Sequence, residues 1–245
     1  MRDFTGPVTG DAFGTALTAY WQGDVEAQLL IERDDGFLER NLPSLYFGPP
    51  EDLDEWDAWC LERANGRVLD VGCGPGRHLA ALQAGGADVT GVDPSELLVT
   101  ICHERGLSAV VGALPDLPRD LGAFDTLLLL GNNLGLLGSR EQAAAVLAGL
   151  AAVAGPDAQV LATTVDPCPD GCASAHHPYH QANTEAGRLP GELVLRARYR
   201  NLADPWFEYL LISPRDLEQL LVGTGWRLAD SYGRDGRYAV RLVRS

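Results

Sequence analysis

The sequence has 245 residues, of which 46% are hydrophobic, so it is long enough and apolar enough to bury a core, and disorder along its whole length is excluded. Its formal net charge of −15 disfavours nucleic acid and acidic membrane surfaces as partners, because the average field would repel both. The N-terminus shows no apolar signal segment, and the most apolar helix candidate is too short to span a bilayer. We therefore expect a cytoplasmic protein.

The first 65 residues are predicted to form an N-terminal helical cap. Apolar residues recur at spacings of three and four over residues 25–33, and residues 53–64 follow an acidic start, so both stretches are expected to be helical. The prolines and glycine of residues 42–50 predict a loop between them.

From residue 66 onward, apolar strands alternate with helices. Strands are predicted at residues 67–71, 88–92, 108–111, 124–130 and 159–165. Helices are predicted at residues 77–83, 94–104 and 139–154, the last with Ser139 as its N-cap. This alternation predicts an α/β fold, in which a parallel Rossmann-like sheet carries helices on both faces.

The pattern changes after the fifth strand. The Pro, Gly, His and Cys residues of 167–190 predict a loop, and the strict alternation of residues 192–200 predicts a half-buried strand. A second strand at 206–212 would complete a β-hairpin insertion. A helix capped by Ser213 and strands at 227–231 and 238–243 then bring the sheet to seven strands. We expect two parts, the cap at 1–65 and a domain at 66–245 with the insertion at 167–212.

A glycine-rich loop follows the first strand and reads Asp70-Val71-Gly72-Cys73-Gly74-Pro75-Gly76. Glycines let a backbone bend tightly and approach a ligand, and the free N–H groups of the next helix can face a carboxylate. Asp93 ends the second strand, where a carboxylate can accept two hydrogen bonds from a ribose diol. A plain tight turn, with Asp93 as a helix cap, is the alternative.

Residues 68–78 (VLDVGCGPGRH) resemble the glycine-rich motif of class I methyltransferases, and residues 89–95 (VTGVDPS) resemble their acidic second motif. Residues 112–118 are similar to the adenine-side loop of that family. The resemblance is strong over residues 60–165, and it implies S-adenosylmethionine as the cofactor. The residues that it implies or favours as cofactor contacts are Asp70, Gly72, Cys73, Gly74, Gly76, Asp93, Pro94, Ala113, Leu114 and Asn132.

The sequence departs from the family pattern in two places. Many members place an acidic residue where this chain has Ala113, and members that methylate DNA or protein nitrogen often carry an Asn/Asp-Pro-Pro-aromatic motif where this chain reads GNNLG at residues 131–135. The second departure favours the small-molecule branch, with methyl transfer to an O or N atom, as in specialised metabolism. The alternatives are a nicotinamide-dependent oxidoreductase and a noncatalytic partner protein that binds S-adenosylmethionine.

The side of the site that would bind the methyl acceptor is predicted from the segments not assigned to the cofactor. His177 and His180 are candidates for a general base, because the loop after strand five should overhang the transferred methyl group. Candidate substrate-binding residues are Tyr20, Tyr46, Asn133, Arg188 and Trp206. The arginine row at 196, 198 and 200 is expected to be mostly solvated surface. Residues 10–48 and the hairpin at 192–212 are expected to close over the methyl group.

The cysteines and histidines between Cys168 and His180 raise the alternative of a zinc site. Their spacings, C-x3-C and H-x2-H, do not match the usual structural zinc patterns, so no metal is expected. The five cysteines are scattered and odd in number, which predicts reduced thiols.

Overall fold

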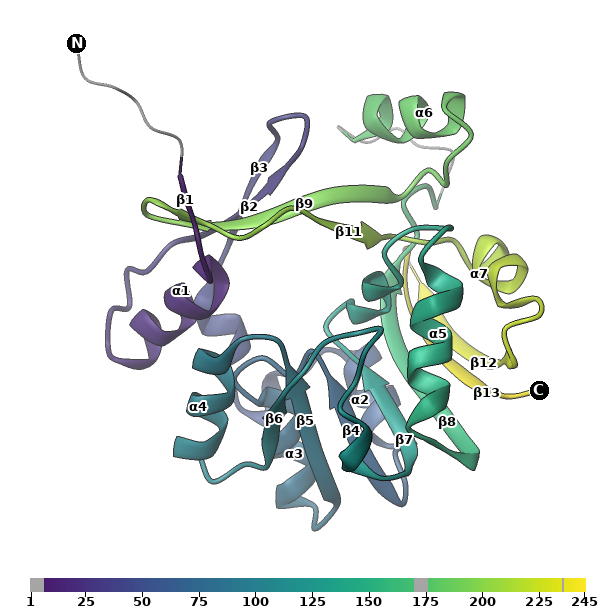
Figure 1. Ribbon diagram of the computed structural model, residues 1–245, viewed down its shortest axis with the longest axis horizontal. Coiled ribbons are helices and arrows are strands. Elements are labelled where there is room, and N and C mark those ends of the chain that lie inside the picture. Colours follow the sequence, from purple (N-terminus) through teal and green to yellow (C-terminus); the bar gives the residue numbers. More distant parts are fainter. Residues whose placement is uncertain (1–6, 170–175, 235) are drawn as a thin grey trace.

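In the computed structural model, which describes residues 7–169, 176–234 and 236–245, one large sheet forms the centre of the fold (Figure 1). Its strand order is β12-β13-β8-β7-β4-β5-β6, and we call it the central sheet. Strands β4 to β8 pair in parallel, while β12 and β13 are antiparallel, which confirms the predicted seven-stranded Rossmann-like sheet. Its strands are β4 (Arg67–Val71), β5 (Asp88–Asp93), β6 (Ala109–Val111), β7 (Phe124–Leu129), β8 (Ala154–Val165), β12 (Trp226–Arg234) and β13 (Arg237–Arg244).

Helices cover both faces of the central sheet, as predicted. One apolar cluster joins α5 and α7 to one face, and a second joins α2, α3 and α4 to the other. Strand β7 is buried on both faces, because Leu127 belongs to the first cluster and Leu128 to the second. The helices are α2 (Glu55–Leu61), α3 (Arg77–Ala84), α4 (Glu96–Glu104), α5 (Ala143–Ala152) and α7 (Pro214–Leu221).

Two serines were predicted to cap helices, and the structure confirms one of these caps. The Ser213 hydroxyl accepts a hydrogen bond from the Asp216 amide, which confirms its predicted place before α7. The prediction for Ser139 is wrong, because α5 begins at Ala143 and Ser139 instead accepts from the Gln142 amide in the preceding turn. Short 3-10 segments lie at η1 (Pro43–Tyr46), η2 (Pro50–Asp52), η3 (Arg119–Leu121) and η4 (Asn133–Leu137).

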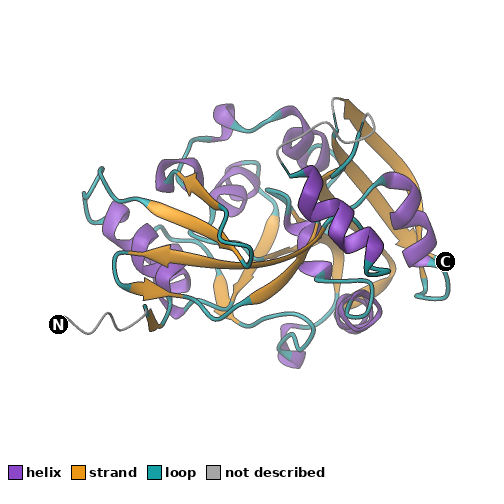
Figure 2. Ribbon diagram, turned by 90° about the horizontal axis from the view of Figure 1, so that it is seen from above, coloured by secondary structure: helices purple, strands orange, loops and turns teal. Residues whose placement is uncertain are grey.

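A second, smaller sheet lies across the ends of the central sheet, and we call it the cap sheet (Figures 1 and 2). Its order is β1-β10-β9-β2-β3, and β11 pairs antiparallel with β9, which confirms the predicted hairpin. Helix was predicted over residues 25–33, but Leu29–Arg33 is strand β2, which pairs with β3 and β9. The strands are β1 (Val8–Thr9), β2 (Leu29–Arg33), β3 (Leu38–Asn41), β9 (Glu192–Tyr199), β10 (Leu202–Ala203) and β11 (Phe207–Leu210).

Helix α1 (Ala12–Trp21) joins the cap sheet to the central domain. Ala12 and Ala16 pack against Leu29 and the buried residues of β9, while Leu17 packs against α4. Helix α2, by contrast, contributes Cys60 to the apolar cluster on the central sheet. The N-terminal region is therefore of mixed structure: part of it builds the cap sheet and part of it covers the central sheet.

Helix α6 (His177–Glu185) lies within the stretch that was predicted to be a loop. Pro178 occupies its first turn, where proline is tolerated, so the proline content of the stretch did not exclude a helix. The Arg33 guanidinium lies 4.2 Å from the Tyr179 ring centre, and the Tyr179 hydroxyl donates to Asp34 at 2.7 Å. These contacts fix α6 to the β2–β3 turn. Within the described parts of the chain, no helix has the length and apolarity to cross a membrane.

Candidate functional site

The glycine loop between β4 and α3 is tied to the end of β5. Gly72, Gly74 and Gly76 all have positive φ, at 74°, 55° and 86°, a conformation that favours glycine. The Gly74 amide donates to Asp93 Oδ2 at 2.9 Å, and the Ser95 amide donates to Asp93 Oδ1 at 2.9 Å. Asp93 therefore organises the loop directly, a role that the sequence prediction did not include.

The glycines of the loop serve two different purposes. A Cβ added at Gly74 would meet no described atom within 4 Å, so a ligand has room to approach the backbone there. A Cβ at Gly76 would come 2.5 Å from Leu107 Cδ1, and Cys73 is buried in the core beneath the loop. Gly74 thus borders open space, whereas Cys73 and Gly76 support the loop from behind.

Two buried carboxylates, Asp70 and Asp93, lie at the edge of the central sheet where β4 and β5 end. Burial raises the pKa of Asp70 to about 6, against the opposing effect of the nearby His78, and burial raises the pKa of Asp93 to about 6 as well. Asp70 Oδ2 is buried without a hydrogen-bond partner among the described residues. A buried acceptor without a partner is costly, so this oxygen suits a ligand that brings a donor, and an ammonium group is the best such donor.

The adenine-side residues lie beside Asp93. The Gly112 amide donates to the Asp93 carbonyl at 3.1 Å, which places the start of the loop after β6 next to the end of β5. Ala113 and Pro94 are exposed, and Leu114 is half-buried against the main apolar cluster. These positions lie at the edge of the sheet where the resemblance predicts the adenine and ribose.

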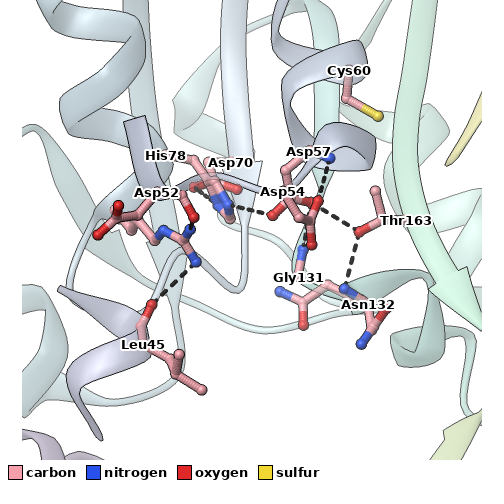
Figure 3. A network of polar contacts seen from close by, with 12 residues as sticks. Leu45, Asp52, Asp54, Asp57, Cys60, Asp70, His78, Gly131, Asn132 and Thr163 are labelled. Carbon is pink, nitrogen blue, oxygen red and sulfur yellow. Dashed lines mark hydrogen bonds and ion pairs between the residues drawn. The ribbon is translucent and has the colours of Figure 1, made fainter. Parts of the chain in front are cut away.

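The turn after β7 completes the edge (Figure 3). Gly131 and Asn132 both have positive φ, at 64° and 71°, and the second value is unusual for a residue other than glycine. The Asn132 amide donates to Thr163 Oγ1 at 3.0 Å, and its carbonyl accepts from the Tyr209 hydroxyl at 2.5 Å. Asn133 Nδ2 donates to the Gly72 carbonyl at 3.0 Å, so this predicted substrate residue supports the glycine loop.

The cap contributes several aromatic side chains, of which Tyr209 contacts the edge through the Asn132 carbonyl. Tyr46 is largely buried, which raises the pKa of its hydroxyl to about 12, and this hydroxyl accepts from Asn41 Nδ2 at 2.8 Å. Tyr20 packs on Phe47, with ring centres 5.4 Å apart. The Tyr209 ring packs against Gly135, where an added Cβ would lie 2.2 Å from the nearest ring atom. Tyr209 was not among the predicted site residues, although the alternation of the hairpin could have placed it on the inner face.

The remaining predicted residues do not gather at this edge. His180 is buried with Nδ1 2.8 Å from the Pro190 carbonyl, and His177 is exposed at the start of α6. Figure 1 shows α6 beyond β9 as seen from β4 and α3. Arg188 donates to the Asn183 side chain, and Trp206 is 43% exposed. The prediction of a loop here is wrong, because residues 177–185 form helix α6. The role of His177 and His180 as general bases stays a prediction.

The metal and thiol predictions fall partly outside the described residues, since 170–175 include Cys172. Among the residues that the structure describes, no group of three potential His, Cys, Asp or Glu ligands could hold a metal ion. Cys60, Cys73 and Cys102 are free and buried, but Cys168 is disulfide-bonded. The expectation of reduced thiols is therefore wrong for Cys168.

Residues 68–157, which span the glycine loop and Asp93, match the family described as a methyltransferase domain. These residues carry a methyltransferase domain, and the fold is that of class I methyltransferases. S-adenosylmethionine is the cofactor of this domain family, and a similar structure, a SAM-dependent methyltransferase from Bacteroides fragilis, contains S-adenosyl-L-homocysteine. That structure superimposes with a TM-score of 0.79 over 96% of this chain and 95% of the other, at 23% identity.

Two further proteins are similar to the methyltransferase domain and its surroundings. The CcbJ methyltransferase from Streptomyces caelestis has a TM-score of 0.57 at 17% identity, over 82% of this chain and 92% of the other. The tRNA U34 carboxymethyltransferase of Methylococcus capsulatus is 30% identical over 174 residues, which are 68% of this chain. The match covers 46% of that relative, so this chain spans less than half of the relative's length.

Proposed function

We propose that the protein transfers a methyl group from S-adenosylmethionine to an O or N atom of a small molecule. The observation that carries this proposal is the buried Asp70 Oδ2, which accepts no hydrogen bond from the described residues, in the same strand–loop segment as the open face of Gly74. When bound, the cofactor supplies an electrophilic methyl group on a sulfonium. Asp70 would accept from its ammonium group, and Asp93 would accept from its ribose hydroxyls through lone pairs that the Gly74 and Ser95 amides leave free.

The protein's contribution to the reaction is alignment and the exclusion of water. The cap sheet lies over the edge (Figure 1), and the cap contributes Tyr46 and Tyr209, whose side chains are both half-buried. These side chains would orient an acceptor and shield it from water, which competes for the methyl group. No role in proton transfer is proposed for His177 or His180, because α6, which begins at His177, lies beyond β9 as seen from β4 (Figure 1).

Charge favours a small acceptor over a nucleic acid. The overall charge is −15, and the arginines of β9 and of the turn after it are paired with carboxylates of the cap. Arg196 and Arg198 lie 2.8 and 3.3 Å from Glu32, and Arg200 lies 3.2 Å from Asp24. Two carboxylates therefore offset most of the charge of these three arginines, and the row provides little basic surface for phosphates.

A tRNA acceptor is the second candidate, and the name of the Methylococcus relative is the observation that favours it. The two candidates differ in what they require of the surface, since tRNA binding depends on phosphate contacts and weakens steeply with salt. Methyl transfer to a small molecule would show no comparable dependence.

The deciding experiment begins with calorimetric titration of S-adenosylhomocysteine, with NADH as the control for an oxidoreductase. Methyl-labelled S-adenosylmethionine is then incubated with the protein and either a metabolite fraction or total tRNA. We expect binding of S-adenosylhomocysteine alone, and label in the metabolite fraction. Label in tRNA that ribonuclease releases would overturn the small-molecule acceptor. Binding without turnover on either fraction would favour a noncatalytic partner, and binding of NADH alone would favour the oxidoreductase.

A further inference from the structure

A chain of buried polar contacts runs beneath the cofactor edge and is not accounted for by the proposed cofactor contacts (Figure 3). It begins at Asp70 Oδ2, which lies 3.8 Å from His78 Nδ1. The other ring nitrogen, His78 Nε2, lies 3.2 Å from Asp57 Oδ2. One imidazole thus lies between two carboxylates, and both carboxylates are buried.

The second oxygen of Asp57 continues the chain to the end of β7. Asp57 Oδ1 accepts from the Gly131 amide at 3.1 Å and from Thr163 Oγ1 at 3.1 Å. Thr163 Oγ1 in turn accepts from the Asn132 amide at 3.0 Å. Asp57 is therefore the point at which the charged group around Asp70 meets the strained turn that carries Asn132.

This arrangement is more than helix α2 needs for its own stability. The N-cap of α2 is Asp54, whose carboxylate accepts from the Asp57 amide at 2.8 Å. Burying a histidine between two carboxylates costs several kcal/mol of desolvation, which ion pairing offsets only in good geometry. Backbone strain at Asn132 likewise persists only where surrounding contacts fix it, and such strain concentrates at functional sites.

We infer that Asp57 and His78 are positioning residues for the amino-acid end of the cofactor. A protonated His78 maintains Asp70 as the carboxylate that accepts from an ammonium group, while Asp57 fixes the turn that presents Asn132. This inference rests on the proposed function, since it assigns a purpose to groups behind the same site.

The electrostatics agree with this geometry. Burial opposes a charge on His78, but the Asp57 hydrogen bond and the charges of Asp70 and Asp57 together raise its pKa. Burial also opposes a charge on Asp57, yet the contact with His78 and the Gly131 and Thr163 donors lower its pKa. Arg77 is the cation whose charge opposes protonation of His78, and Asp93 is a further anion near Asp70.

The test compares His78→Gln, which keeps a donor for Asp57 and removes the charge, with Asp54→Ala, which removes the helix cap and leaves the buried pair in place. The affinity for S-adenosylhomocysteine is titrated from pH 5 to 8 in each. We expect His78→Gln to move the acid limb of affinity, the fall in binding as Asp70 is protonated, upward by about one pH unit, and so to weaken binding about twofold at pH 7 and close to tenfold at pH 5. Asp54→Ala should lower the melting temperature without moving the limb.

Two outcomes overturn the inference while leaving the proposed function intact: an unshifted limb in His78→Gln, or an equal shift in both variants. The wild-type imidazole, followed by nuclear magnetic resonance, gives a reading that needs no variant to fold. His78 should remain protonated at pH 6.5, and a neutral ring at pH 6 would overturn the inference. If the wild-type protein fails to bind S-adenosylhomocysteine at any pH, the proposed function fails first, and the inference fails with it.

Discussion

The cofactor edge and the cap sheet are built from the sequence in opposite ways. The edge gathers Asp70, Gly74, Asp93 and Asn132 from consecutive strand ends, and its loops follow directly from the strands that carry them. The cap sheet pairs segments from the two ends of the chain, as the ion pair between Glu32 and Arg198, 166 positions apart, illustrates. The edge is therefore specified by local backbone rules, and the cap by long-range pairing. Damage to each should have a separate signature.

The largest effect is expected from Gly74→Val, which should abolish binding of S-adenosylhomocysteine. A branched Cβ would fill the open space above the loop, at a φ of 55° that such residues avoid. Gly86→Val is the matched control, because Gly86 also has positive φ and open surroundings but lies after α3. Calorimetry and circular dichroism would compare them. Equal loss of binding in both variants would mean that backbone strain alone explains the result.

Asp93→Ala should weaken S-adenosylhomocysteine binding by roughly 1.5–3 kcal/mol, the range for losing a charged hydrogen-bond partner. The structure adds that the substitution also releases the Gly74 amide, so part of the loss comes from the loop itself. Asp93→Asn keeps one acceptor oxygen and should lose less. A dissociation constant unchanged in both variants would remove Asp93 from the site.

The pH dependence of binding should show the two buried carboxylates. Their pKa values are raised to about 6 in the fold from a usual value of 3.8, so the unliganded fold is favoured by protonation as pH falls from 6 toward 4. A ligand that needs ionised Asp70 and Asp93 should bind about tenfold more weakly per pH unit for each group protonated below pH 6. Calorimetry between pH 5 and 8 would measure this, and a flat profile would contradict it.

The smallest effect is expected from a substitution in the cap that contacts the edge. Tyr209→Phe removes the hydrogen bond to the Asn132 carbonyl, worth about 0.5–1.5 kcal/mol. We expect turnover to fall severalfold while the affinity for S-adenosylhomocysteine changes little, because Asp57 and Thr163 still hold the turn at Gly131 and Asn132, whereas the freed Tyr209 ring belongs to the acceptor side. Tyr238→Phe is the control, since its hydroxyl donates to the Ile212 carbonyl within the core. Equal effects on turnover would indicate that both hydroxyls only stabilise the fold.

The contrast between edge and cap also explains which features could be predicted from sequence. The glycine loop and Asp93 were predictable because each depends on a few neighbouring residues at the end of a strand. Strand β2 was not, because its apolar spacing also suits a helix and its partner β9 lies far along the chain. The histidines of α6 were misplaced because a segment rich in proline and histidine can still form a helix once β2 and β3 provide a surface.

The cap sheet has a consequence for how the protein is made. Roughly 160 residues separate the end of β2 at Arg33 from the start of β9 at Glu192. At a synthesis rate of about 5–20 residues per second, the β2–β3 hairpin leaves the ribosome about 8–30 s before its main partner exists. During that interval Leu29, which is fully buried in the finished protein, has no contact with the β9 residues that later pack against it. It is then available to chaperones or to a neighbouring nascent chain.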